Sequence, residues 1–223
     1  MLSSYQEKLL EVNSAMRELA GMIEKAQKTA FDGFKNSDTR KLDEAKEALK
    51  GCGSKANEID NEVIKTLALY GPEATELREM VGYLKMTNEL VNTCSTLRSY
   101  IKNNKSLIAG EFDLGKIKAS LQALHQSALN AVTSMVKMID ISQSEEELRS
   151  LYRSIKVEES KGDDLYSIVQ KDLSDTLYHT DIDPLDFMTV LKLARKLERI
   201  SDHATDVARL LIYIKSGGEL GSG

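Results

Sequence analysis

Two pairs of acidic side chains in the last third of the chain have the spacing of a metal site. Glu159 and Asp163 are four residues apart, as are Glu198 and Asp202. On an α-helix this spacing puts both members of a pair on one face, where like charges repel unless a cation lies between them. Asp206 extends the second pair by one turn. If the two helices are antiparallel neighbours, these carboxylates converge into a cluster suited to Mg²⁺, Mn²⁺, Ca²⁺ or Fe³⁺.

The same acids also have a plainer interpretation. The chain contains 35 acidic residues among 223, so pairs at this spacing also arise by chance, and an acidic stripe is commonly the solvated face of a helix. Arg195 and Arg199 are alternative partners for Glu198, in which case the acids belong to a salt-bridge network between helices. His203, beside Asp202, either supports a ligand or is simply exposed.

Several kinds of catalytic site are excluded by the residues that are missing. Di-iron carboxylate bundles place Glu three residues before a ligating His, and this holds for none of the three histidines, which are His125, His179 and His203. The sequence also lacks a G-x-x-x-x-G-K phosphate loop and a Cys/His pair at zinc spacing. We therefore expect no enzymatic activity and no organic cofactor. His125 lies on an apolar stripe and is expected in the core or at its edge.

The composition is that of a folded, mildly acidic protein. The net charge of −5, with 41% apolar and 29% charged residues, predicts no nucleic-acid partner, because such proteins need a basic face. No apolar run approaches the roughly 20 residues of a membrane span, so we expect a cytoplasmic protein that reaches a membrane only through partners. Cys52 and Cys94 are too few for a disulfide-stapled fold and are expected as buried thiols.

The elements that must position the acids are helices. Apolar residues recur at intervals of three and four along most of the chain, and the chain contains only two prolines. Ser144 with Glu147 forms a capping box, and Asp183 before Pro184 is a second helix start. The breaks between stripes predict six helices: one up to Phe34, one from Asp38 to Tyr70, then 73–101, 110–138, 144–177 and 183–214.

Six helices with short connections divide into three plus three. The predicted fold is all-α, with two tandem antiparallel three-helix bundles related by an internal pseudo-repeat and laid end to end. The predicted domains are residues 1–106 and 107–223.

The last helix carries the motif LERISDHATDVA from Leu197 to Ala208, followed by an apolar stretch and by Gly217-Gly218. This resembles the PhoU family signature E-R-I-G-D-H-A-T-N-I-A, with Ser201 and Asp206 as departures. The segment 71–78 is similar to the family's P-x-A-x-D-L-R, the segment 159–166 is similar to its D/E-x-x-x-D-E-L-Y, and the length matches almost end to end.

The resemblance implies two tandem three-helix bundles with carboxylate metal clusters that often hold iron, or otherwise Mn, Mg, Zn or Ca. The implied ligands in the second repeat are Glu159, Asp163, Glu198 and Asp202. In the first repeat only Asp60 survives, because the corresponding positions hold Ala56, Val91 and Ser95. Asp206, His203 and Asp60 are expected as additional ligands or as residues that support the ligands.

The resemblance also implies a function. PhoU-like proteins act in the cytoplasm, couple the ATPase subunit of the phosphate ABC transporter to a sensor histidine kinase, and act as negative regulators of the phosphate-starvation response. They tend to form homodimers. Two other functions stay open: a metal-binding protein for cation handling or weak metal-dependent hydrolysis, and a helical scaffold without metal. The scaffold predicts that Glu198→Ala and Asp202→Ala change little.

Overall fold

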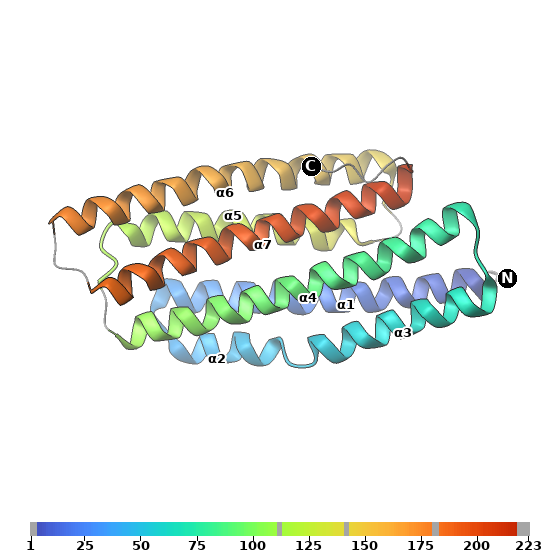
Figure 1. Ribbon diagram of the computed structural model, residues 1–223, viewed down its shortest axis with the longest axis horizontal. Helices are drawn as coiled ribbons and strands as arrows, with labels where there is room; N and C mark the ends of the chain where they lie inside the picture. The colour runs from blue at the N-terminus through green and yellow to red at the C-terminus, as the bar shows by residue number, and fades with distance from the viewer. Residues whose placement is uncertain (1–3, 111–112, 141–142, 180–182, 218–223) are drawn as a thin grey trace.

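The computed structural model describes residues 4–110, 113–140, 143–179 and 183–217, without the side chains of residues 178 and 179. Every regular element in these ranges is an α-helix, as predicted (Figure 1). The helices are α1 (Ser4–Asn36), α2 (Thr39–Ala48), α3 (Cys52–Tyr70), α4 (Ala74–Ala109), α5 (Ile117–Met138), α6 (Glu145–His179) and α7 (Pro184–Ser216). None of these helices combines the length and apolar character that a bilayer crossing requires.

The helix predicted from Asp38 to Tyr70 is wrong in one respect, because it is two helices. α2 ends at Ala48, and α3 begins at Cys52. Gly51 lies between them with φ of +82°, in a left-handed conformation that glycine adopts without steric cost. The first repeat therefore has four helices, of which α2 and α3 together fill the place of one.

The predicted end of the third helix at Ile101 is also wrong. α4 runs on to Ala109, and Asn104 is fully buried within it. Asparagine is disfavoured in a helix by less than about 1 kcal/mol, and Leu107 beyond it packs into the core. Burial of the last turn therefore outweighs the local preference for a break.

Both predicted helix starts are confirmed. The Ser144 backbone N–H donates to Glu147 Oε2 at 2.8 Å, and the Glu147 N–H donates to Ser144 Oγ at 3.3 Å, which is the reciprocal pattern of a capping box. Asp183 Oδ1 accepts from the Leu185 N–H at 2.8 Å, with Pro184 in the first turn. These caps fix where α6 and α7 begin.

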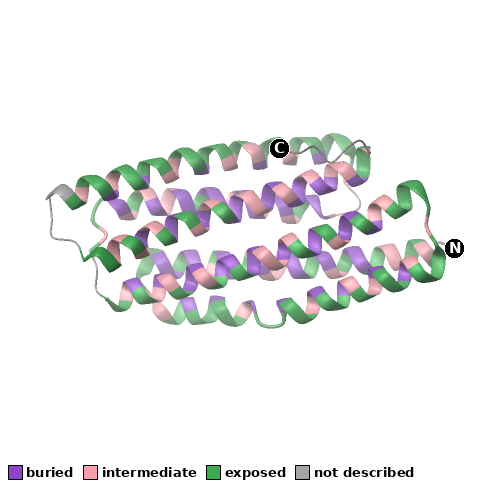
Figure 2. Ribbon diagram, viewed as in Figure 1, coloured by how far each residue is buried: buried purple, intermediate pink, exposed green. Residues whose placement is uncertain are grey.

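The two repeats lie side by side, so the expected end-to-end arrangement is wrong. α4 packs along α7 in the antiparallel direction, and α1 packs against α5 (Figure 1). Buried residues line the facing sides of these helices (Figure 2) and form one core cluster with residues from both repeats. The predicted domain boundary after residue 106 falls within the last turn of α4 and stays a prediction.

His125 lies in this shared core. Its side chain is fully buried, Nδ1 is 3.0 Å from the Tyr100 hydroxyl, and its ring contacts the Phe31 ring in a tilted arrangement at a centroid distance of 4.5 Å. Burial lowers the pKa of His125 to about 3, because a charged imidazole would lose its hydration. The expectation of a core position is confirmed. Cys52 and Cys94 are buried free thiols, also as expected.

Candidate metal centre

Three of the four predicted ligands converge where α6 meets α7. Asp163 on α6 and Glu198 and Asp202 on α7 each offer a carboxylate oxygen, and these oxygens all lie within 4.8 Å of one another. We call these three residues the second-repeat cluster. Carboxylate oxygens at this density are the donor set that hard cations prefer.

The local sequence explains how the two helices present these acids. On α7, Leu197, Ile200 and Ser201 are buried toward the core, and the four-residue spacing then puts Glu198 and Asp202 together at the edge of that face. On α6, Gly162 is buried opposite α7, and a Cβ there would lie 3.8 Å from Ser201 Oγ. This distance is an ordinary van der Waals contact, so α6 packs directly on α7 beside the cluster.

The second-repeat cluster holds more negative charge than its surroundings balance. Burial raises the pKa of Glu198, and the charges of Asp202 and Asp163 add to the rise, although Arg195 forms an ion pair with Glu198. Burial also raises the pKa of Asp202, with further contributions from Asp163 and Glu159. The Glu198 side chain is only 12% exposed. A bound cation would relieve this repulsion, so the residues fit a metal.

Glu159 does not join the cluster. Its carboxylate forms an ion pair with Lys156, one turn earlier on α6, and its side chain is only 17% exposed. Its charge still raises the pKa of Asp202. Glu159 therefore lies near the three clustered acids, but its carboxylate is paired with Lys156.

His203 and Asp206 meet a residue of the first repeat. His203 Nδ1 lies 2.9 Å from Glu89 Oε2 on α4, and the three residues each offer a ligand atom within 4.8 Å of the others. We call Glu89, His203 and Asp206 the inter-repeat cluster. Burial raises the pKa of Asp206, and Arg209 at 3.0 Å opposes that rise. Sequence reasoning missed Glu89, because no acidic residue lies three or four positions from it and its partner His203 is 114 residues away.

Comparison with known proteins places both repeats in one family. Residues 16–102 and residues 125–211 each match the PhoU domain. The chain belongs to the PhoU family. The second-repeat cluster lies wholly within the second PhoU domain, whereas the inter-repeat cluster takes Glu89 from the first and the other two residues from the second.

Named PhoU relatives match over nearly their whole length. A protein of Rhizobium meliloti (strain 1021), called phosphate-specific transport system accessory protein PhoU homolog, is 22% identical over 219 residues, covering 98% of this chain and 90% of the relative. A protein with the same name from Xylella fastidiosa (strain Temecula1) is 24% identical over 230 residues, covering 99% and 92%.

Solved PhoU structures share the fold. The crystal structure of the phosphate transport system regulatory protein PhoU from Streptococcus pneumoniae gives a TM-score of 0.82 at 14% identity, covering 98% of this chain and all of that one. PhoU from Pseudomonas aeruginosa gives 0.77 at 21% identity, covering 96% of this chain and 100% of that one. The tandem PhoU repeat predicted from the sequence is confirmed.

The first PhoU domain does not gather a matching carboxylate cluster within the described part of the chain. Asp60 on α3 has a buried Oδ1 without a hydrogen-bond partner, and burial raises its pKa. Ala56 is buried, Val91 is partly buried and Ser95 is exposed, and none of them offers a carboxylate. Asp60 therefore stands without the acids that would share a cation with it.

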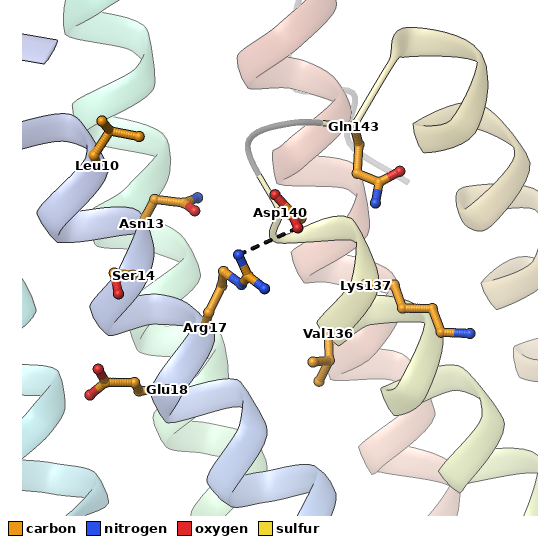
Figure 3. A pocket seen from close by; sticks show the side chains of 9 residues that line it. All are labelled: Leu10, Asn13, Ser14, Arg17, Glu18, Val136, Lys137, Asp140 and Gln143. Carbon is orange, nitrogen blue, oxygen red and sulfur yellow. Dashed lines mark ion pairs between the residues drawn. The ribbon is translucent and has the colours of Figure 1, made fainter. Parts of the chain in front are cut away.

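A polar surface pocket of about 630 Å³ lies between α1 and the end of α5 (Figure 3). Arg17 and Asp140 form an ion pair across it at 3.4 Å. Glu18 and Lys137 also line it, so its two acids and two bases balance. The pocket marks a seam between the PhoU repeats, and its balanced charge makes it less suited to a cation than the acidic clusters on α7.

Proposed function

We propose that this chain is an accessory regulator of phosphate uptake. In this role it couples the ATPase subunit of a phosphate ABC transporter to a sensor histidine kinase in the cytoplasm. It restrains the phosphate-starvation response when phosphate is plentiful, and it does so by binding and not by catalysis. The observation that carries the proposal is the match of both PhoU domains, together with relatives of nearly equal length that are named as phosphate-transport accessory proteins.

The architecture supports a binding role. α4, α6 and α7 each exceed 30 residues, and helices of this length present long faces that a partner helix or domain can contact. We also propose that the protein forms a homodimer, which light scattering of the purified chain would detect as twice the monomer mass.

We propose that the second-repeat cluster holds a hard cation such as iron, Mn²⁺ or Mg²⁺, with Zn²⁺ and Ca²⁺ as further candidates. Asp163, Glu198 and Asp202 would supply the oxygen ligands. A bound cation would supply positive charge that offsets three carboxylates and ties α6 to α7. The three acids also set the charge and shape of the surface formed by α6 and α7, where a partner would dock.

The metal proposal predicts a loss of metal in a defined variant. Protein purified without chelator or a nickel column is expected to carry metal, whereas Asp163→Asn/Glu198→Gln, which removes two of the three charges, is expected to carry none at this cluster. Elemental mass spectrometry measures the difference. Asp164→Asn/Glu146→Gln is the control, because it removes two exposed charges from α6 outside the cluster. Equal metal in both variants would contradict the site.

The regulatory proposal predicts derepression in cells that lack the chromosomal copy. A reporter driven by a phosphate-starvation promoter is expected to be active in phosphate-rich medium, because the kinase is no longer restrained, and to become silent again when the chain is restored. Reporter activity measures this, and a pull-down from the restored cells is expected to recover the transporter ATPase or the kinase. A reporter that stays silent without the chain would count against the proposal.

The second candidate is cation handling or weak metal-dependent hydrolysis. The observation that favours it is the exposure of Asp163, which leaves the second-repeat cluster open to solvent, as a catalytic metal requires. This candidate predicts that loss of the chain changes cellular metal content and leaves the phosphate reporter silent.

A further inference from the structure

The inter-repeat cluster differs from the second-repeat cluster in composition and in place. It contains an imidazole nitrogen, and its carboxylates come from both repeats, since Glu89 and His203 are 114 residues apart in the sequence. The His203 side chain is 13% exposed and that of Glu89 is 22% exposed. Only the packing of α4 on α7 brings these groups together.

The distance between the two closest donors suits a shared cation. Two ligands bound at about 2.1 Å to one tetrahedral metal lie about 3.4 Å apart. His203 Nδ1 and Glu89 Oε2 are 2.9 Å apart. A cation could therefore replace the proton between them if the two side chains separate by about 0.5 Å, a shift that rotation of the side chains supplies without movement of either helix.

The two acids of the cluster have different partners. Asp206 is paired with Arg209 at 3.0 Å, and Glu89 Oε2 lies 2.9 Å from His203 Nδ1. That contact is satisfied either by a proton on the imidazole or by a metal ion bound to it. Glu89, Asp206 and Arg209 also line a surface cavity of about 430 Å³, together with Lys85 and Asn88. The cavity gives a cation a route from solvent and room for water ligands.

We propose that Glu89, His203 and Asp206 form a second metal site, for a borderline divalent ion such as Zn²⁺, that links the first repeat to the second. One nitrogen and two carboxylate oxygens are a donor set that zinc accepts, and the remaining coordination position would face the cavity. The site goes beyond the proposed function and does not depend on it, because it shares no residue with the second-repeat cluster.

The test uses a chain in which the second-repeat cluster is already removed. Asp163→Asn/Glu198→Gln protein, stripped of metal and dialysed against Zn²⁺ at pH 7.5, is expected to retain one zinc per chain. Adding Glu89→Gln/Asp206→Asn is expected to abolish it. Adding Glu76→Gln/Asp186→Asn is expected to leave it unchanged, because these acids lie on the same two helices, roughly 20 Å or more from the cluster at 1.5 Å per residue. Elemental mass spectrometry measures zinc per chain.

Two results would overturn the site: no zinc in the Asp163→Asn/Glu198→Gln protein, or zinc that persists after Glu89→Gln/Asp206→Asn. A spectroscopic measurement on the wild type covers the case of a variant that folds poorly. Zinc is expected to shift the ¹⁵N resonances of the His203 imidazole in an NMR titration, since direct coordination changes the electronic environment of the ring nitrogen. A titration in which zinc leaves the His203 resonances unmoved would equally refute the site. If the phosphate reporter did not respond to loss of the chain, the proposed regulatory function would fail, but the zinc content and the NMR titration would still test this metal site.

Discussion

Lowering the pH from 7.5 to 5 is expected to destabilise the folded chain by about 2 kcal/mol through His125 alone. Burial lowers the pKa of His125 to about 3 in the folded chain, whereas an unfolded histidine titrates near 6.5. Between these values the unfolded state binds a proton that the folded state does not bind. The stability contribution is therefore complete above pH 6.5 and is lost as the pH falls toward 3.

Urea unfolding at pH 7.5 and pH 5 measures this effect. Tyr100→Phe/His125→Leu removes the titrating ring together with its hydroxyl partner, so that neither is left buried and unpaired, and the loss between the two pH values is expected to shrink by about 2 kcal/mol. Tyr100→Phe alone is the control, because it keeps the imidazole and should keep the pH dependence. An unchanged pH dependence in the double variant would show that His125 is not protected from protonation.

Gly82→Ala is expected to destabilise the fold by about 1–2 kcal/mol, even though alanine favours helices. Gly82 lies on α4 where α7 passes, and a Cβ there would lie 2.5 Å from Ile214 Cδ1 and Cγ1. Overpacking of this kind costs roughly 1–3 kcal/mol, while the gain in helix propensity is at most about 1 kcal/mol. Ile214 would have to leave its rotamer, or the two helices would have to separate.

Gly21→Ala is the matched control. A Cβ at Gly21 on α1 would meet nothing within 4 Å, so the same substitution is expected to stabilise the chain by up to about 1 kcal/mol. Urea unfolding midpoints of both variants, compared with the wild type at one pH, measure the difference. Equal midpoints for the two variants would mean that α4 and α7 are not in close contact at Gly82.

The parts of the fold that depend on short sequence separations were predictable. The capping box at Ser144 and the cap at Asp183 involve residues two or three apart, and the structure confirms both. The convergence of Glu198 with Asp202 follows from the helical period alone. Asp163 joins them because α6 and α7 are consecutive antiparallel helices, which a short connection already implies.

The parts that depend on which faces meet were not predictable from one sequence. An amphipathic stripe shows that a helix face is buried, but it does not identify the helix that covers it. The side-by-side packing of the repeats was missed for this reason, and Glu89 was missed with it, because its partner His203 is 114 residues away. Glu159 was assigned to the cluster on spacing, but Lys156 competes for its carboxylate. Gly51 and Gly53 weaken the predicted helix through their low helix propensity, but the sequence does not show that the backbone at Gly51 is left-handed and ends the helix there.

The contact of α4 with α7 also joins the two repeats into one packed unit. Bonds cross the seam at several points: Glu89 to His203, Thr133 Oγ1 to Glu24 Oε1 at 2.8 Å, and Asn13 Nδ2 to the Ile139 carbonyl at 2.8 Å. Each repeat completes the core of the other, so separating them would expose apolar surface on both. A surface formed by α6 and α7 therefore depends for its support on α4, which belongs to the other repeat.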